Sequence, residues 1–207
     1  MVLENDFLNF QAELHTPEIA HKLKSVTVGI AGLGGLGSNA AIALARAGVG
    51  TLILVDFDEV ELSNLNRQAY FIEHVGMAKT DALSDLISRI NPFITLEVKC
   101  IRITQENCME IFGKASVVIE AVDEADIKAM IIETILSEST SISVVAGSGM
   151  AGYGKNNTIR ENSFPRLRIL GDGETEALPG VPLMAPRVGV VSCMQANAAL
   201  EILLGEL

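Results

Sequence analysis

A glycine-rich segment near the N-terminus is the first part of the chain whose residue types point to chemistry. Residues 32–37 read GLGGLG and contain the spacing G-x-G-x-x-G at Gly32, Gly34 and Gly37. The segment follows a short apolar run at 26–31 and opens a stretch of small residues typical of a helix. Glycines allow a tight turn and a close approach to phosphates, which bind the free N–H groups of a helix N-terminus. The pattern predicts a nucleotide loop, although glycines used only for helix–strand packing would also fit it.

A group of polar side chains follows the second apolar run. Asp56 ends that run, where a carboxylate can accept hydrogen bonds from ribose hydroxyls. Asn64, Arg67 and Gln68 come next, and Lys79 opens the following helix-like segment. A guanidinium fork, neutral amides and a second cation suit the oxygens of a triphosphate, and a dinucleotide dehydrogenase does not require them. The group favours ATP over NAD, although Arg67 or Lys79 taken alone also fits a solvated surface.

One further acid is placed to take part. Asp123 comes just after the apolar run at 116–120. The carboxyl edge of a parallel sheet is where ligands bind, and a carboxylate there is placed to hold Mg²⁺ between phosphates. The same residue also fits a cap for the helix-like segment that follows.

Apolar runs and helix-like segments alternate along the chain at least four times. We expect strands at 26–31, 51–55, 94–101, 116–120 and 142–146. We expect helices at 36–47, 76–90, 104–112 (with Thr104 as the cap), 124–137 and 187–204. This alternation predicts an α/β fold with a doubly wound, mostly parallel sheet of the Rossmann-like type.

The chain shows no internal repeat or domain boundary. We expect a single domain over residues 1–207, in which residues 1–24 form a helical lead-in. The regular alternation fails at 150–186, which is rich in Gly, Pro and Asn. An irregular segment of that length in a compact domain is usually functional.

Composition excludes several classes of protein. The 207 residues are 49% hydrophobic, and 15 basic against 26 acidic side chains give a net charge of −11. A nucleic-acid binder would instead need clustered Lys and Arg, so we expect no nucleic-acid partner. The apolar stretches are interrupted before the ~20 residues of a membrane span, and the acidic start does not resemble a signal peptide. Three scattered cysteines fit a cytoplasmic protein.

The order of these motifs resembles the family that includes ThiF, MoeB and the ubiquitin-activating enzymes. The resemblance covers about residues 20–150 well and the final helix more loosely. The motifs that carry it are GLGGLG at 32–37, AGVG at 47–50, DFD at 56–58, SNLNRQ at 63–68, Gly76-x-x-Lys79 and the turn at Asp123. The combination is far more specific than the glycine loop alone, and it implies a ThiF-type nucleotide-binding fold.

The resemblance also implies a set of roles and a reaction. The implied nucleotide-binding residues are Gly34, Gly35, Gly37, Asp56 (ribose), Asp58, Asn64, Arg67, Gln68 and Lys79 (triphosphate). Arg67, Lys79 and Asp123 would be catalytic, with Asp123 holding Mg²⁺. The implied partner is a ubiquitin-like sulfur carrier protein ending in Gly-Gly, whose C-terminal carboxylate attacks the α-phosphate of ATP. The enzyme would thus be an adenylyltransferase. A ThiS-like carrier of thiamine biosynthesis is favoured, molybdopterin or another thio-metabolite pathway stays open, and a homodimer is usual in the family.

The chain departs from the family in three places. It lacks paired CxxC motifs, so we expect no structural zinc. It has no cysteine in the loop at 176–182, and we expect Cys193 to be a buried helix residue, which predicts adenylation without a covalent cysteine step. It has no clear counterpart of the family's N-terminal arginine. We expect the segment 150–186 either to guide the carrier's tail or to be a structural loop. We expect its arginines, at 160, 166 and 168, either to contact an acidic carrier or to be solvated.

Three other functions remain open on the sequence alone. The first is an ATP-dependent dehydratase of the same family that acts on a modified tRNA base, against which the acidic charge counts. The second is a nicotinamide-binding oxidoreductase, which would leave Asn64, Arg67, Gln68 and Lys79 without a role. The third is a scaffold protein, which would have no need of these phosphate-site residues.

Overall fold

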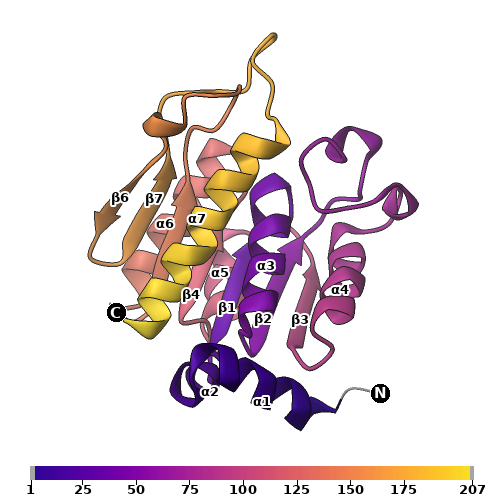
Figure 1. Ribbon diagram of the computed structural model, residues 1–207. Helices are drawn as coiled ribbons and strands as arrows, with labels where there is room; N and C mark the ends of the chain where they lie inside the picture. The colour runs from indigo at the N-terminus through magenta and orange to yellow at the C-terminus, as the bar shows by residue number, and fades with distance from the viewer. Residues whose placement is uncertain (1–2, 206–207) are drawn as a thin grey trace.

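A seven-stranded sheet forms the centre of the computed structural model, which describes residues 3–205 (Figure 1). The strands, in spatial order, are β3 (Thr95–Cys100), β2 (Thr51–Asp56), β1 (Thr27–Ala31), β4 (Val117–Glu120), β5 (Ser143–Gly147), β7 (Leu167–Gly171) and β6 (Arg160–Phe164). Every neighbouring pair is parallel except β6 and β7. The apolar runs of β1, β2, β4 and β5 are buried because both faces of the sheet are covered. The predicted doubly wound, Rossmann-like fold is confirmed.

Helices cover both faces of this sheet. They are α1 (Glu4–His15), α2 (Pro17–Ser25), α3 (Gly35–Ala47), α4 (Lys79–Ile90), α5 (Gln105–Phe112), α6 (Ala125–Glu138) and α7 (Ala185–Leu204). In Figure 1, α3, α4 and α7 lie on the near face, and α5 and α6 lie behind the sheet. Each layer has its own apolar cluster, represented by Leu44 and Val191 on one face and by Phe112 and Ile135 on the other. Thr104 caps α5 as predicted, by accepting a hydrogen bond from the Asn107 amide.

The predicted helical lead-in is confirmed over its described residues and consists of α1 and α2. Figure 1 shows both helices below the amino ends of the strands, opposite the edge where the glycine loop lies. Gly50, before β2, packs so closely on α2 that a Cβ there would lie 1.8 Å from the Lys24 carbonyl oxygen. Residues 1, 2, 206 and 207 of the predicted domain lie outside the described part of the chain.

Helix α7 is long and apolar enough, by length and composition, to cross a membrane. Half of its most apolar window is buried inside the fold, where Val188, Ala196 and Ala199 pack into the cluster shared with α3. The small side chains let α7 and α3 approach closely, so the apolar character of α7 is explained by packing in the core.

The prediction that 150–186 is irregular is wrong over residues 160–171. These residues form the hairpin of β6 and β7, and β7 adds to the main sheet in parallel with β5. The signal was weak because β6 is an edge strand, whose sequence RENSF faces water and shows no apolar run. Irregular backbone remains at 148–159, apart from the short turn η3 (Asn156–Thr158), and at 172–184.

A buried ion pair ties these two irregular segments to the start of α7. Arg187 donates hydrogen bonds to the Asp172 carboxylate at 2.5 Å and to the Gly154 carbonyl oxygen at 2.6 Å. The Arg187 and Asp172 side chains are only 4% and 5% exposed. Burial raises the pKa of Asp172, but hydrogen bonds from the amides of Thr175 and Glu174, from the Thr175 hydroxyl and from Arg187 lower it to about 2 overall.

We expect Asp172→Asn to destabilise the fold by about 3–5 kcal/mol, because it leaves the buried Arg187 charge without a partner. Asp85→Asn is a matched control, since Asp85 pairs with Arg89 on the surface and its loss should cost about 1 kcal/mol or less. Urea unfolding at neutral pH measures both free energies. Equal losses in the two variants would contradict the assigned role of the buried pair.

The same pair predicts a pH dependence of stability. The folded pKa of Asp172, about 2, lies below its ordinary value of 3.8. Its contribution is therefore fully present above the ordinary value and is lost as the pH falls through the folded value. Urea unfolding of the wild type and of Asp172→Asn should give free energies that converge as the pH is lowered across this range. A constant difference would contradict the assignment.

Candidate active site

The glycine loop leaves the end of β1 at the middle of the sheet. Gly32 has a φ of +88°, and a Cβ there would lie 2.9 Å from the Ala121 carbonyl oxygen. A Cβ on Gly37 would lie 1.9 Å from the Gly32 carbonyl oxygen, so these two positions admit only glycine. Helix α3 begins at Gly35, and no side chain caps its N-terminus. Its first N–H groups therefore face the carboxyl edge of the sheet as an anion-binding site.

The two middle glycines face the polar segment that follows β2. A Cβ on Gly34 would meet only the Gln68 side-chain amide, at 3.8 Å. A Cβ on Gly35 would lie 3.0 Å from Val188 and 3.4 Å from the Cγ atom of Arg67. Gly34 therefore leaves room in front of Gln68, and Gly35 lets the chain of Arg67 lie against the loop. The structure brings together these four residues, which the sequence analysis assigned to nucleotide binding.

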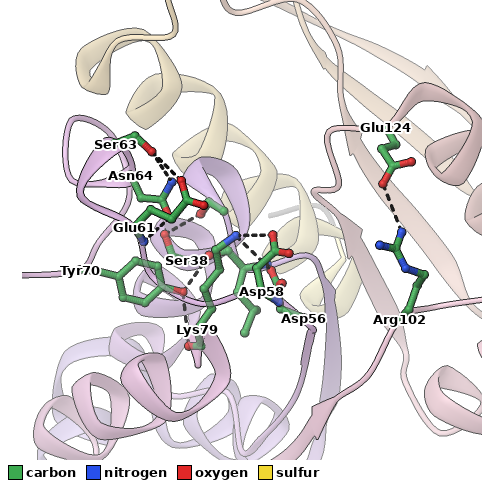
Figure 2. Close-up of polar contacts among 12 residues, drawn as sticks. Ser38, Asp56, Asp58, Glu61, Ser63, Asn64, Tyr70, Lys79, Arg102 and Glu124 are labelled. Atoms are coloured by element: carbon green, nitrogen blue, oxygen red, sulfur yellow. Dashed lines mark hydrogen bonds and ion pairs between the residues drawn. The ribbon is translucent and has the colours of Figure 1, made fainter. Parts of the chain in front are cut away.

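A buried cation lies between two acids beside the loop. Lys79, only 6% exposed, donates from Nζ to Asp58 at 2.8 Å and lies 4.0 Å from Asp56 (Figure 2). The Lys79 amide also donates to the Asp58 carbonyl oxygen, at 2.9 Å. Asp56 accepts hydrogen bonds from the amides of Leu33, at 2.6 Å, and Asp58, at 2.9 Å. Asp56 thus holds the glycine loop, and free lone pairs remain on its carboxylate oxygens for a ribose.

The arginine and the amides lie around a short turn, η1 (Leu62–Asn64). Arg67 donates to the side-chain oxygen of Asn66 at 2.7 Å and to the Ser63 carbonyl oxygen at 3.3 Å. Asn64 is buried, and its side-chain oxygen accepts the Glu61 amide at 3.0 Å, so in this structure it closes the turn. Among residues 3–205, the carbonyl oxygen of the Gln68 side chain is buried without a hydrogen-bond partner, so it is available to a ligand or water.

Three residues that the sequence analysis missed hold this segment against the glycine loop. Asn39 donates to the Arg67 carbonyl oxygen at 3.0 Å, and the Ser38 hydroxyl accepts the Ala69 amide at 3.1 Å. The buried Tyr70 hydroxyl donates to the Leu33 carbonyl oxygen at 2.8 Å (Figure 2). A hydroxyl on a ring two residues after SNLNRQ was the available signal for Tyr70. No sequence pattern indicated Ser38 or Asn39, because their hydrogen-bond partners are fixed by the tertiary structure.

Asp123 lies in the turn between β4 and α6, as predicted, and is exposed. It is not the cap of α6, because that position belongs to Glu124. Within residues 3–205 its side chain enters no hydrogen bond or ion pair, and no group of three or more His, Cys, Asp or Glu converges. Mg²⁺ is commonly held by one or two carboxylates together with substrate phosphates, so a free carboxylate at this edge fits such an ion. The absence of a structural zinc stays a prediction.

A buried carboxylate lies at the end of the strand that leads into the Asp123 turn. Glu120, at the end of β4, is fully buried and forms an ion pair with Lys128 of α6. Burial raises the pKa of Glu120, and the charge and hydrogen bond of Lys128 oppose that change. The Gln195 side-chain amide donates to the carbonyl oxygens of Glu120, at 3.1 Å, and Val145, at 3.3 Å. These contacts fix the end of β4, from which the Asp123 turn starts.

Arg102 links three strand ends on the other side of the site. Its guanidinium carbon lies 3.9 Å from the centre of the Phe57 ring, and it pairs with Glu124 at 3.3 Å (Figure 2). Phe57 follows β2, Arg102 follows β3 and Glu124 precedes α6. The carboxyl ends of β2, β3 and β4 are therefore joined on the side of the sheet away from Lys79.

Two expectations about other residues are corrected. Cys193 was expected to be buried, but it is exposed. The buried stripe of α7 includes Ser192 and Ala196, and Cys193 lies about 100° around the helix from its neighbour, on the solvent side. Arg166 was considered for an acidic partner but donates to the carbonyl oxygens of Leu136, Ser139 and Ile142 at the end of α6.

Arg168 was considered for the same role and is also engaged within the chain. It pairs with Glu161 at 2.7 Å and with Glu201 at 3.5 Å. Arg160 lies on the exposed edge strand β6. Of the three arginines, only Arg160 has no intramolecular ion pair or side-chain hydrogen bond among residues 3–205, and its contact with an acidic carrier stays a prediction.

A glycine loop at the end of β1, an acid at the end of β2 and a cation beside each of them are typical of a nucleotide-binding protein of the Rossmann-like class. Comparison with known families gives the narrower assignment. The family model described as the ThiF family matches residues 8–206, so the chain belongs to the ThiF family. The resemblance drawn from the motifs is confirmed.

Curated relatives support the same assignment. The chain is 35% identical over 186 residues to the molybdopterin-synthase adenylyltransferase of Salmonella typhimurium and covers 74% of its length. It is 32% identical over 209 residues to the sulfur carrier protein ThiS adenylyltransferase of Escherichia coli, of which it covers 83%. It is 33% identical to the adenylyltransferase and sulfurtransferase UBA4 of Eremothecium gossypii but spans only 43% of that protein. The alignments include 87%, 98% and 89% of this chain, respectively.

Solved structures show the same fold. The E. coli tRNA N6-threonylcarbamoyladenosine dehydratase TcdA, in complex with ATP, superposes with a TM-score of 0.87 over 99% of this chain and 97% of its own, at 22% identity. E. coli MccB with ATP superposes with a TM-score of 0.70 over 96% of this chain and 62% of its own, at 21% identity. At these identities the comparison supports the fold alone.

The exposure of the three cysteines provides a test of how β3, α5 and α7 pack in the fold. We expect Cys100 and Cys193 to react with a thiol reagent in the native protein, because both are exposed. Cys108 is buried, and burial with a nearby Glu138 raises its pKa to about 11, so it should react only after unfolding. Labelling with and without urea, followed by mass spectrometry of peptides, counts the reactive thiols. Native labelling of Cys108 or protection of Cys193 would contradict the arrangement.

Proposed function

We propose that this chain is an ATP-dependent adenylyltransferase that activates the C-terminal glycine carboxylate of a ubiquitin-like sulfur carrier protein. The observation that carries the proposal is the placing of three polar side chains at the glycine loop. Arg67 and Gln68 lie against Gly35 and Gly34 at the N-terminus of α3, and Lys79 lies 4.0 Å from the Asp56 carboxylate that accepts the Leu33 amide. Backbone N–H groups suit the phosphates of a dinucleotide as well as those of ATP, but the two added cations favour a triphosphate. The adenylyltransferases named among the relatives support this choice.

The chemistry requires positioning and charge neutralisation. A carboxylate oxygen of the carrier attacks the α-phosphorus of ATP, an acyl–phosphate bond forms, the bond to the β-phosphate oxygen breaks, and pyrophosphate leaves. No general base is needed, because the terminal carboxylate is already ionised at neutral pH. Arg67 and Lys79 would stabilise the charge on the phosphates, and Asp56 would orient the ribose. Mg²⁺, held by Asp123, would add positive charge between phosphate groups.

The finer assignments rest on the relatives. The E. coli protein named for ThiS favours a ThiS-like carrier and thiamine biosynthesis, and the Salmonella protein keeps molybdopterin synthesis open. We propose a Gly-Gly terminus on the carrier, a homodimer and a cytoplasmic location on the same grounds as in the sequence analysis. Since Cys193 lies on the outer face of α7 and the loop at 176–182 has no cysteine, we also propose that no enzyme thioester forms.

A second candidate is the ATP-dependent dehydration of a modified tRNA base. It is considered because this chain has the fold of the tRNA dehydratase TcdA over 97% of that protein's length. The net charge of −11 opposes binding of a phosphate-rich tRNA. The two candidates are distinguished by which added substrate, a carrier protein or tRNA, stimulates ATP turnover.

The test of the proposed function is ATP–pyrophosphate exchange with Mg²⁺ and a ThiS-like carrier ending in Gly-Gly. We expect exchange with the intact carrier and none with a carrier that lacks its last glycine. Arg67→Ala and Asp123→Ala should each reduce the rate about 100-fold or more, since each removes charge stabilisation at the reacting phosphates. The matched controls Arg89→Ala and Asp85→Ala, from an exposed surface pair, should retain the wild-type rate.

The proposal would be contradicted if no carrier supported exchange in a protein that circular dichroism shows to be folded. Stimulation of ATP hydrolysis by tRNA under the same conditions would move the assignment to the dehydratase. Exchange that persists in Arg67→Ala would keep the activity but remove that residue from it.

A further inference from the structure

The hydroxyl of Tyr70 lies where three parts of the candidate site meet. It donates to the Leu33 carbonyl oxygen of the glycine loop at 2.8 Å and lies 3.4 Å from the carbonyl oxygen of Lys79, at the start of α4. Tyr70 itself ends the segment that carries Arg67 and Gln68. No sequence motif assigned a role to Tyr70, and the proposed reaction does not involve its side chain.

Both backbone polar groups of Leu33 are held by side chains. Its N–H donates to the Asp56 carboxylate at 2.6 Å, and its carbonyl oxygen accepts from Tyr70. Leu33 is fully buried, so without Tyr70 its carbonyl would lose the partner shown here. The next residue, Gly34, is the N-cap of α3. The direction of the first N–H groups of α3 therefore depends on how the backbone on either side of the Leu33 Cα atom is held.

The Tyr70 hydroxyl is held in one place by the packing of its ring and stays protonated. Tyr70 is 4% exposed, and its ring meets the buried ring of His74 edge-on at a centroid distance of 6.3 Å. Burial, with the nearby Asp56 charge, raises the pKa of Tyr70 far above its ordinary value, so the hydroxyl keeps its proton. Figure 2 shows the ring reaching from the segment after η1 toward the Lys79 backbone.

The hydrogen bonds of Ser38 and Asn39 join fewer parts of the site than those of Tyr70. Ser38 and Asn39 connect α3 to the Arg67 segment but reach no residue of α4 in the contacts of residues 3–205. Tyr70 alone among the three lies within hydrogen-bonding distance of both the loop and the first residue of α4. The Lys79 amine lies 4.0 Å from the Asp56 carboxylate that holds the loop, so the separation of the loop and α4 sets where this amine lies relative to the α3 N-terminus.

We propose that Tyr70 is a positioning residue that fixes the glycine loop relative to Lys79, so that backbone N–H groups and the lysine amine address one polyphosphate together. The proposal rests on the proposed ATP-dependent function and deepens it. Tyr70 would touch no reacting atom and would act through the Leu33 peptide and the start of α4.

The test is direct ATP binding by isothermal titration calorimetry, which needs no carrier protein. Tyr70→Phe removes one oxygen and keeps the ring, and we expect it to weaken ATP binding about 5- to 10-fold, the range of losing one well-placed hydrogen bond. Adenosine, which has no phosphate, should bind both proteins equally. Tyr153→Phe is the matched control, because Tyr153 is the other tyrosine of the chain and is 82% exposed. All titrations are run where circular dichroism shows every variant folded.

A double-mutant cycle separates positioning from a general loss of stability. Lys79→Met removes the amine, and in that background Tyr70→Phe should have a much smaller effect on ATP binding, because the arrangement that the hydroxyl maintains has already lost one member. A hydroxyl with a merely structural role would lower the melting temperature and leave the ATP affinity of the folded protein unchanged.

The outcomes are distinguishable. Wild-type affinity in Tyr70→Phe, or effects that add fully in the cycle, would overturn the positioning role while leaving the proposed function intact. Failure of the folded wild-type protein to bind ATP at all would overturn the proposed function itself. Weaker ATP binding, unchanged adenosine binding and a non-additive cycle would support both.

Discussion

The hydrogen bond from the Leu33 amide to the Asp56 carboxylate joins the two strand ends on which the candidate site depends. Neighbouring parallel strands β1 and β2 end side by side, and this 2.6 Å contact links the residues that leave them. Asp56 accepts the Asp58 amide as well, which starts the turn that brings Asp58 to Lys79. One buried carboxylate thus sets the glycine loop, the acidic turn and, through Asp58, the start of α4.

The site shows how an acidic protein can bind a polyanion. The net charge of −11 is spread over the chain, but the donors beside the loop are backbone N–H groups, Arg67 and Lys79. Lys79 is buried between two carboxylates, so its charge is compensated before a ligand arrives and its position is fixed. An arriving phosphate meets groups that are already ordered, which reduces the entropy lost on binding. Local geometry outweighs net charge here.

Strands β1, β2, β4 and β5 could be predicted to within about two residues, because buried parallel strands appear as continuous apolar runs. The hairpin of β6 and β7 could not, because its edge strand is polar and solvent exposed. Cys193 was misplaced for a different reason. A small apolar residue suits either side of α7, and only the packing of that helix on its neighbours fixes which side is buried.

Residues of the site, like the strands, could be predicted only where the sequence carries a local pattern. Asp56, Arg67 and Lys79 could be found because their order along the chain is itself a signal. The partners of Tyr70, 37 residues back and nine residues forward, follow from the sheet order and leave no local pattern. Asn64 was found but was given only a ligand role, whereas its side chain closes the turn through the Glu61 amide. Motif spacing predicts the groups that would meet a ligand, and tertiary contacts identify the groups that hold them in place.

The irregular segments at 148–159 and 172–184 combine a fixed base with exposed tips. Arg187 and Asp172 bind them to the start of α7, and the Asn66 side chain donates to the Leu183 carbonyl oxygen at 3.1 Å, which links them to the Arg67 turn. Tyr153 and Leu178 nevertheless stay largely exposed. Because the buried Arg187–Asp172 pair anchors the bases, we expect that the tips can contact another protein without moving the backbone at the start of α7.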